Sequence, residues 1–187
     1  MSENGKPPSR ETSFWGGEGK AADAAMWEMS LWGEAGPAMH CHSLVATIDI
    51  WKCYEQVDHF VLLDSARDLN SPPRLLSMAI ILYRMCRVIQ VEGAFTDKFN
   101  CTSTIVAGCS MATALLQALA VRVGDAHCKL WPNIRLKVVV DDMTLQAIAT
   151  RSRILRWFIP ALVHFVQFLE NQLLLPVALD KGHILGS

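Results

Sequence analysis

Two apolar, β-prone runs of residues each end in aspartate, and this pattern limits the possible folds more than any other feature of the chain. The first run extends from Leu44 to Ile50 and carries Asp49 near its end. The second covers residues 136–140 and is followed by Asp141 and Asp142, after which an extended pattern resumes. Runs that are apolar on both faces are typical of buried strands, and Asp is favoured in turns. The pattern predicts a strand, then later a strand, acidic turn and strand. The two acidic sites meet only if their strands are neighbours in one sheet.

Helical segments separate these strands. Asn70 or Ser71 can cap a helix with Pro72 in its first turn, and apolar residues follow at helical spacing. The fold class that this order predicts is α+β, with an antiparallel sheet and helices packed on one face. The other expected elements are a hairpin over residues 88–104 with its turn at Glu92 and Gly93, a helix from Ser110 to about Gly124, a helix from Ser152 towards Asn171 with a kink or restart at Pro160, and an edge strand or hairpin over residues 176–185.

Composition agrees with a packed domain. Hydrophobic residues make up 51% of the 187 residues and charged residues 19%, with a net charge of -1, so composition gives no electrostatic reason to expect nucleic-acid binding. Residues 1–40 are acidic and rich in Gly and Ala, and we expect a flexible leader there, followed by a domain over residues 41–187. The richest apolar stretch, residues 157–179, is interrupted by polar residues and Pro160, so we expect no membrane span. The six cysteines are irregularly spaced with no C-x-x-C pair, which favours reduced thiols in an intracellular protein, nuclear or cytoplasmic.

The three aspartates have a chemistry in common if they meet. Carboxylates a few ångströms apart raise one another's pKa, whereas a divalent cation stabilises the ionised set. Oxygen ligands of this kind suit Mg²⁺, and two such ions can activate an attacking 3′-hydroxyl and stabilise a leaving pyrophosphate. Taken singly, Asp49, Asp141 and Asp142 are also ordinary strand-end and turn residues.

Four motifs in order strengthen the catalytic interpretation. They read TIDIWKCYEQV, TIVAGCSMATALLQALA, LKVVVDDMTLQ and LPVALDKGHILGS. Over about residues 44–187 this series resembles the palm of reverse transcriptases, closest to the non-LTR retrotransposon (LINE-like) type. The resemblance implies an RNA-directed DNA polymerase that extends a DNA primer on an RNA template from deoxynucleoside triphosphates. It also implies two-metal nucleotidyl transfer with Mg²⁺, or Mn²⁺ in its place.

The resemblance implies metal ligands and a proton donor. Asp49 and Asp141 match the aspartates that bridge the two metal ions, and Asp142 the one that tunes or partly coordinates them. A backbone carbonyl near Ile50 adds a further oxygen. Lys181 matches the lysine proposed to give a proton to the departing pyrophosphate, although a solvated surface lysine is an equal alternative.

The resemblance also implies nucleotide-binding residues. Tyr54 matches the aromatic that lies under the sugar and leaves no room for a 2′-hydroxyl, and a core aromatic is its alternative role. Gly108 and Ser110 match the loop and helix start that support the template base and the nucleotide. The family commonly has Pro-Gln before that glycine, whereas this chain has Val106 and Ala107, so a polar contact is lost.

Two further parts of a polymerase have no match in the sequence. Basic fingers ahead of the first motif and a thumb after the last are expected to be reduced or missing, so we expect a partial, retroelement-derived copy with weak or no activity in isolation. An unknown partner could supply these parts. The alternative function is a catalytically inactive palm remnant that serves as a binding or interaction domain.

Overall fold

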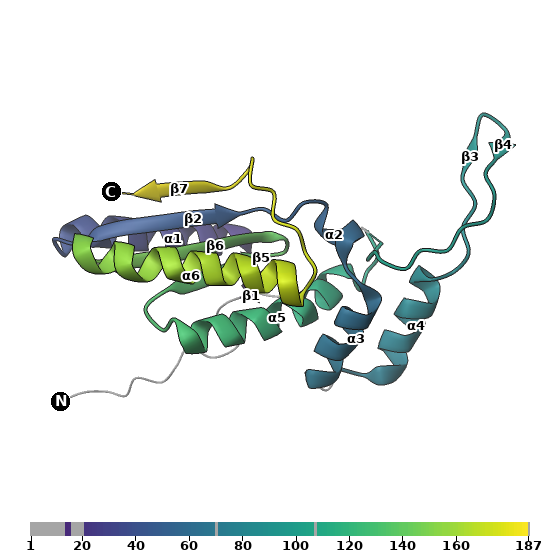
Figure 1. Ribbon diagram of the computed structural model, residues 1–187, viewed down its shortest axis with the longest axis horizontal. Coiled ribbons are helices and arrows are strands. Elements are labelled where there is room, and N and C mark those ends of the chain that lie inside the picture. Colours follow the sequence, from purple (N-terminus) through teal and green to yellow (C-terminus); the bar gives the residue numbers. More distant parts are fainter. Residues whose placement is uncertain (1–13, 16–20, 70, 107, 187) are drawn as a thin grey trace.

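A five-stranded sheet with helices on both faces forms the centre of the molecule (Figure 1). The computed structural model describes residues 14–15, 21–69, 71–106 and 108–186. The sheet strands are β1 (Phe14–Trp15), β2 (His42–Ile48), β5 (Arg135–Val139), β6 (Asp142–Ala149) and β7 (His183–Gly186), and β3 (Gln90–Val91) pairs with β4 (Ala94–Phe95) elsewhere. The helices are α1 (Ala22–Ala38), α2 (Cys53–Gln56), α3 (His59–Asp68), α4 (Pro73–Tyr83), α5 (Ala112–Leu130) and α6 (Arg151–Gln172).

The sheet confirms the predicted strand arrangement. Its order is β1-β5-β6-β2-β7, and all neighbours are antiparallel except β1 and β5. The strand that carries Asp49 at its end therefore lies directly beside the hairpin that carries Asp141 and Asp142. The predicted C-terminal edge strand is β7, which pairs with β2 at the margin of the sheet.

One face of the sheet packs on α5 and α6, as the sequence predicts. Alternate residues of β2 and β6, such as Ile48 and Leu145, point into this layer together with Phe158 and Phe165 of α6. Pro160 lies inside α6, which runs through it as one helix. Two predicted helix starts are shifted by one or two residues. Helix α5 begins at Ala112 after the N-cap Met111, and α6 begins at Arg151 after the N-cap Thr150, so Ser110 precedes its helix and Ser152 lies in the first turn. Asn70 lies outside the described residues.

Helix α1 adds a layer on the other face that the sequence analysis does not expect. It lies within the segment expected as a leader, and it contacts β2, β5 and β6. The buried ammonium of Lys137 pairs with the carboxylate of Glu28, which also reaches Arg135 at 3.2 Å. The Gln146 amide donates to the carbonyl of Met29 at 3.1 Å. These contacts join residues that lie far apart in the sequence, so no local sequence pattern indicates them.

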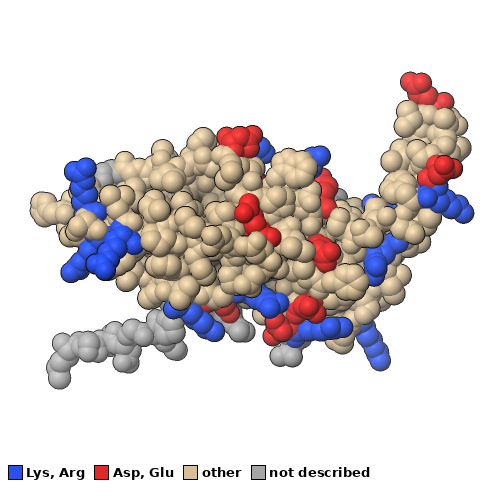
Figure 2. Space-filling view, in the orientation of Figure 1, with Lys and Arg blue, Asp and Glu red and all other residues tan. Residues whose placement is uncertain are grey.

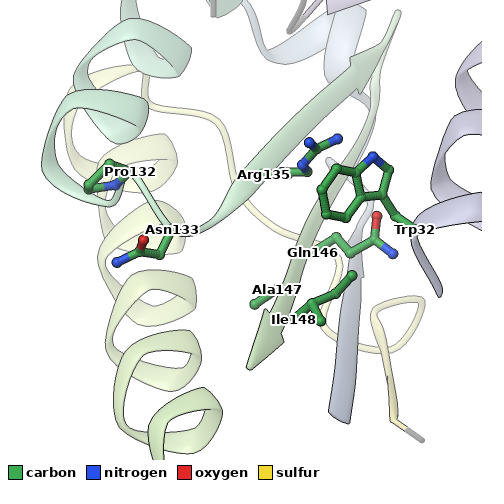
Figure 3. Close-up of a pocket in the computed structure, with 7 residues that line it drawn as sticks. All are labelled: Trp32, Pro132, Asn133, Arg135, Gln146, Ala147 and Ile148. Atoms are coloured by element: carbon green, nitrogen blue, oxygen red, sulfur yellow. The ribbon is translucent and has the colours of Figure 1, made fainter. Parts of the chain in front are cut away.

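Trp32 completes the contact between α1 and the sheet. The guanidinium carbon of Arg135 lies 3.2 Å from the centroid of the indole ring, a cation–π contact. Figure 3 shows the two side chains together at one side of a pocket of about 190 Å³. The other lining residues are Pro132, Asn133, Gln146, Ala147 and Ile148.

Helix α4 and a hairpin arm lie at one end of the molecule, beyond the sheet (Figure 1). The predicted turn at Glu92 and Gly93 is confirmed, with φ angles of 50° and 86° that suit a tight hairpin. The second arm strand is short, as its polar residues predict. Among the described residues no helix is both long and apolar enough to cross a membrane.

A buried histidine between α5 and α6 makes stability depend on pH. His127 is 1% exposed, neither of its ring nitrogens has a hydrogen-bond partner, and its ring lies against Phe165. Burial, with a smaller contribution from His164, lowers the pKa of His127 from 6.5 to about 4. The unfolded chain therefore binds this proton more readily than the folded chain does, so acidification favours unfolding.

We expect the free energy of unfolding to fall by about 2 kcal/mol between pH 7 and pH 5 because of His127. Urea titrations across this range measure the loss. In His127→Leu an apolar side chain without a titratable group fills the site, so the part of the pH dependence that His127 causes should vanish. An equal pH dependence of the free energy of unfolding in both proteins would contradict the assignment to His127.

Candidate active site

One end of the sheet brings together the backbone segments that carry the three predicted aspartates. The register of β2 and β6 runs from His42 opposite Ala149 to Ile48 opposite Met143. Extended by one step, this register sets Asp49 opposite Asp142, and the charge of Asp49 does act on the Asp142 carboxyl. Neighbouring strands are about 4.8 Å apart, so the two backbones at this point are within reach of one bound ion.

A two-residue turn presents the third carboxylate. Val139 and Asp142 close the β5–β6 hairpin, which leaves Val140 and Asp141 at its tip. Val140 has a φ of 59°, a conformation that β-branched residues rarely adopt. Such positions cost about 1–3 kcal/mol and cluster at functional sites. The turn fixes Asp141 at the end of the sheet, next to the strand end of β2.

Asp49 is held on its other side by the segment that follows α6. The backbone N–H of Ala178 donates to the carbonyl of Asp49 at 2.9 Å, and the N–H of Lys181 donates to the carbonyl of Ala178 at 3.1 Å. This turn places the ammonium of Lys181 2.9 Å from a carboxylate oxygen of Asp49. Lys181 thus lies at the predicted site, as an ion-pair partner of the first aspartate.

Charge repulsion within the site is visible in the pKa of Asp142. Partial desolvation raises this pKa first, and the negative charges of Asp141 and Asp49 raise it further. The pKa of Lys181 is also raised, by its hydrogen bond to Asp49 and the charge of that carboxylate, but for a lysine this favours the charged form, the ammonium. The end of the sheet is therefore a centre of negative charge that attracts a cation.

Tyr54 lies beside the carboxylates on the one-turn helix α2. Lys52, with a φ of 47°, turns the chain into this helix, and the carbonyl of Tyr54 accepts the N–H of Ile105 at 2.7 Å. Burial raises the pKa of the Tyr54 phenol, the charge of Asp141 raises it further, and a hydrogen bond with Thr113 opposes them. The ring is half-buried at the edge of the core, so both predicted roles of Tyr54 are compatible with its position.

Ile50 forms an isolated bridge with Val177. The hydrogen bonds of this bridge use the carbonyl of Asp49 and the N–H of Trp51. Because successive residues of an extended chain direct their backbone groups to opposite sides, the carbonyl of Ile50 faces the β5–β6 hairpin. The Ile50 side chain is buried, so only its backbone is available at the site.

Gly108 and Ser110 lie in the loop before α5. Gly108 has a φ of 85°, where only glycine avoids strain, and open space surrounds the position of a side chain. Ser110 is exposed and belongs to the turn that leads into the helix. Thr113, in the first turn of α5, connects this loop to Tyr54. Ala107 lies outside the described residues.

Two site residues have no counterpart in the sequence analysis. Cys53 is buried next to Tyr54, and burial together with the charges of Asp141, Asp49 and Glu55 raises the pKa of its thiol to about 12. The thiol is therefore neutral, and it belongs to the hydrophobic core next to the site. Thr113 is the second such residue. Its position three residues after Ser110 is the only signal that the sequence offers.

The side chains at the site are not arranged as a three-ligand metal centre. Within the parts of the chain that the structure describes, no group of three His, Cys, Asp or Glu side chains is placed to hold one ion. The backbone segments that carry the three aspartates lie side by side, as predicted, but among the described residues their carboxylates are not grouped around one point. The carboxylate of Asp49 is paired instead with the ammonium of Lys181.

Comparison with known proteins gives the fold. No family model and no curated protein sequence matches the chain. Among solved structures, apo telomerase from Candida tropicalis truncated from its C-terminal domain is similar with a TM-score of 0.67 and 14% identity, over 94% of this chain and 36% of that one. The chain has a reverse-transcriptase-like fold.

Two further telomerase structures agree. Telomerase from Candida tropicalis in complex with a TWJ fragment of telomeric RNA has a TM-score of 0.70 and 12% identity, over 97% of this chain and 31% of that one. Telomerase from Candida albicans, also in complex with a TWJ fragment of telomeric RNA, has a TM-score of 0.69 and 13% identity, over 92% and 32%. This chain spans about a third of the length of these proteins, and the fold is that of part of the larger chain.

Proposed function

We propose that residues 41–187 form the palm-like part of an RNA-directed DNA polymerase of retroelement origin, on which α1 packs. One observation carries the proposal: the strand ending in Asp49 lies beside the hairpin that ends in Asp141 and Asp142, at one end of a sheet with a reverse-transcriptase-like fold. The substrates proposed are an RNA template, a DNA primer and deoxynucleoside triphosphates.

The residues present suit a divalent metal. The donors are carboxylate oxygens of Asp49, Asp141 and Asp142 and the carbonyl oxygen of Ile50, which are the ligands that Mg²⁺ and Mn²⁺ prefer. The raised pKa of Asp142 is compatible with this: its largest cause is partial burial, and a cation would relieve the smaller part that comes from the charges of Asp141 and Asp49. When bound, two such ions lower the pKa of a primer 3′-hydroxyl and neutralise charge on the phosphates.

The remaining site residues have roles in binding and proton transfer. We assign Tyr54 to the position below the sugar, where its ring excludes a 2′-hydroxyl. Gly108 and Ser110 belong to the loop that supports the template base and the nucleotide. Lys181 has a raised pKa and keeps its proton at neutral pH, so it can hydrogen-bond a phosphate oxygen and donate a proton to the leaving pyrophosphate.

Primer extension tests the proposal directly. The purified chain is incubated with poly(rA)·oligo(dT) and labelled dTTP, with Mg²⁺ or with EDTA. We expect weak incorporation that requires the metal and that does not occur with UTP. Incorporation that persists in EDTA, or no incorporation at any Mg²⁺ or Mn²⁺ concentration, would contradict a polymerase function for this chain.

Lys181→Ala is expected to strengthen metal binding while weakening catalysis. Without the ammonium 2.9 Å from Asp49, that carboxylate is free for a cation, and we expect Mn²⁺ affinity to rise severalfold, up to about tenfold. Titration followed by Mn²⁺ electron paramagnetic resonance measures it. Lys129→Ala, an exposed lysine near the end of α5, is the control. Equal affinities in all three proteins would show that Lys181 does not compete with the metal.

A second function has its own support. The absence of a three-ligand group among the described residues, together with the Lys181–Asp49 ion pair, favours a palm that binds without catalysing. The two functions differ in one result. A binding domain should retain an RNA–DNA duplex in a filter assay and give no extension with either metal.

A further inference from the structure

Helix α4 is apolar on all sides, although only one side is covered. Leu76, Ala79, Ile80 and Tyr83 are buried, and its outer side carries four further large apolar side chains that are 53–65% exposed: Leu75, Met78, Ile81 and Leu82. A helix that is hydrophobic all round is normally buried on all sides. The outer side of α4 therefore has the composition of an interface.

The hairpin arm next to α4 is exposed in the same way. We define the arm as residues 88–99, which include β3 and β4, and every one of these residues is exposed. A two-stranded hairpin on its own is marginally stable in water. The arm nevertheless presents large apolar side chains to solvent: Val88, Ile89, Val91, Phe95 and Phe99.

The helix and the arm carry opposite charges. Residues 71–91 contain Arg74, Arg84 and Arg87 and no acidic residue, whereas the arm contains Glu92 and Asp97 with one lysine. Figure 2 shows acidic atoms at the tip of the arm and again lower on the arm, there beside basic atoms, with further basic atoms around α4. Among the described residues, neither Arg74 and Arg84 nor Glu92 and Asp97 form ion pairs.

We infer that α4 and the arm form a dimer interface with a second copy of this chain, in which the arm of each copy lies along α4 of the other. Such a two-fold contact is self-complementary, since each copy provides one basic helix and one acidic arm. The lengths agree: the eleven residues of α4 span about 16 Å, and the two sides of the arm, four residues before the turn and six after it, span about 13 and 20 Å when extended.

The exposed area is also sufficient. Ten large apolar side chains of α4, the arm and the connecting Met85 are 38–68% exposed. Together they supply on the order of 800 Å², the area that each partner contributes to a stable interface. Monomeric proteins rarely expose an apolar patch of this size. Two α4 helices packed against each other would bring Arg74 and Arg84 of both copies together, and these like charges would repel. Pairing of the helix with the arm is therefore favoured.

Charge reversal with mixing tests the inference on the full chain. The helix variant is Arg74→Glu with Arg84→Glu, and the arm variant is Glu92→Arg with Asp97→Arg. Sedimentation velocity at micromolar concentrations is expected to show a dimer for the natural chain. Each variant alone places like charges in both contacts, and its dimer affinity should fall at least about tenfold.

An equal mixture of the two variants restores both contacts, because the reversed helix of one chain meets the reversed arm of the other. We expect the dimer to reappear in the mixture. The control variant, Arg151→Glu with Arg153→Glu on α6, should dimerise normally, and Leu82→Ser should dissociate the dimer whereas Leu130→Ser does not. Thermal unfolding checks that each variant is folded.

The inference is overturned if the natural chain is a monomer throughout, or if the reversed variants dimerise as it does. It is also overturned if the variants dissociate and their mixture stays monomeric, which is the result expected when each arm folds onto its own helix. These outcomes do not depend on polymerase activity.

Discussion

Asp141→Asn is expected to remove metal-dependent primer extension, with a loss of at least about a hundredfold. Asparagine keeps the size of the side chain and its place at the tip of the β5–β6 hairpin but removes the negative charge. Stabilisation of charge by bound metal is worth several kcal/mol, and each 1.36 kcal/mol is a factor of ten in rate. Labelled dTTP incorporation on poly(rA)·oligo(dT) measures the loss.

A second readout separates the role of Asp141 from a general loss of structure. Because the charge of Asp141 raises the pKa of Asp142, the pKa of Asp142 should fall in the variant, and carboxyl NMR titration detects this. Asp64→Asn, on the exposed surface of α3, is the matched control and should change neither quantity. An active Asp141→Asn protein with a lowered Asp142 pKa would exclude Asp141 as a metal ligand.

Glu28→Gln is expected to lower the free energy of unfolding by about 1–3 kcal/mol, since the buried ammonium of Lys137 exchanges a carboxylate partner for a neutral amide. The Lys137 side chain is 8% exposed beneath α1, and Glu28 supplies its carboxylate. Urea titration at pH 7 measures the change. Glu34→Gln, at an exposed position of the same helix, should change it by less than about 0.5 kcal/mol.

The double variant Glu28→Gln with Lys137→Met shows whether the buried ammonium causes the loss. Methionine has a similar volume and no charge, so stability should return to within about 1 kcal/mol of the natural chain. If the double variant is as unstable as Glu28→Gln, the cost lies in the docking of α1 and not in the buried ammonium of Lys137.

The strands and the position of the acidic site could be predicted because their signals are local. An apolar run that ends in Asp49, and a second that ends in Asp141, each reveal a strand and its end. Their pairing followed from one requirement, that two distant acidic sites meet only in neighbouring strands. The β2–β6 register confirms this pairing.

The layer formed by α1 could not be predicted in this way. Its sequence has Gly33, Gly36 and Pro37 in the last turns, and no N-cap side chain bonds to its first turn, so local signals favour a loop. What stabilises the helix is Glu28 against Lys137 and Trp32 against Arg135, contacts between residues more than 100 positions apart. Tertiary contacts here outweigh weak helix propensity.

The site side chains were the least predictable part. Lys181 was expected either as a proton donor or as a solvated lysine, and it pairs with Asp49. That contact depends on the turn after Ala178, which places an ammonium beside a carboxylate that it does not neighbour in sequence. A motif gives the order of residues along a chain, but it does not show which cationic side chain will pair with a given carboxylate in the folded protein.

With α1 on one face of the sheet and α5 and α6 on the other, a ligand cannot reach Asp49 across either broad surface near the middle of the strands. The remaining approach is end-on, parallel to the strand axes, towards the tip of the β5–β6 hairpin. The turn that carries Lys181 borders this end of the sheet, so a molecule that arrives end-on would meet the Lys181–Asp49 ion pair first.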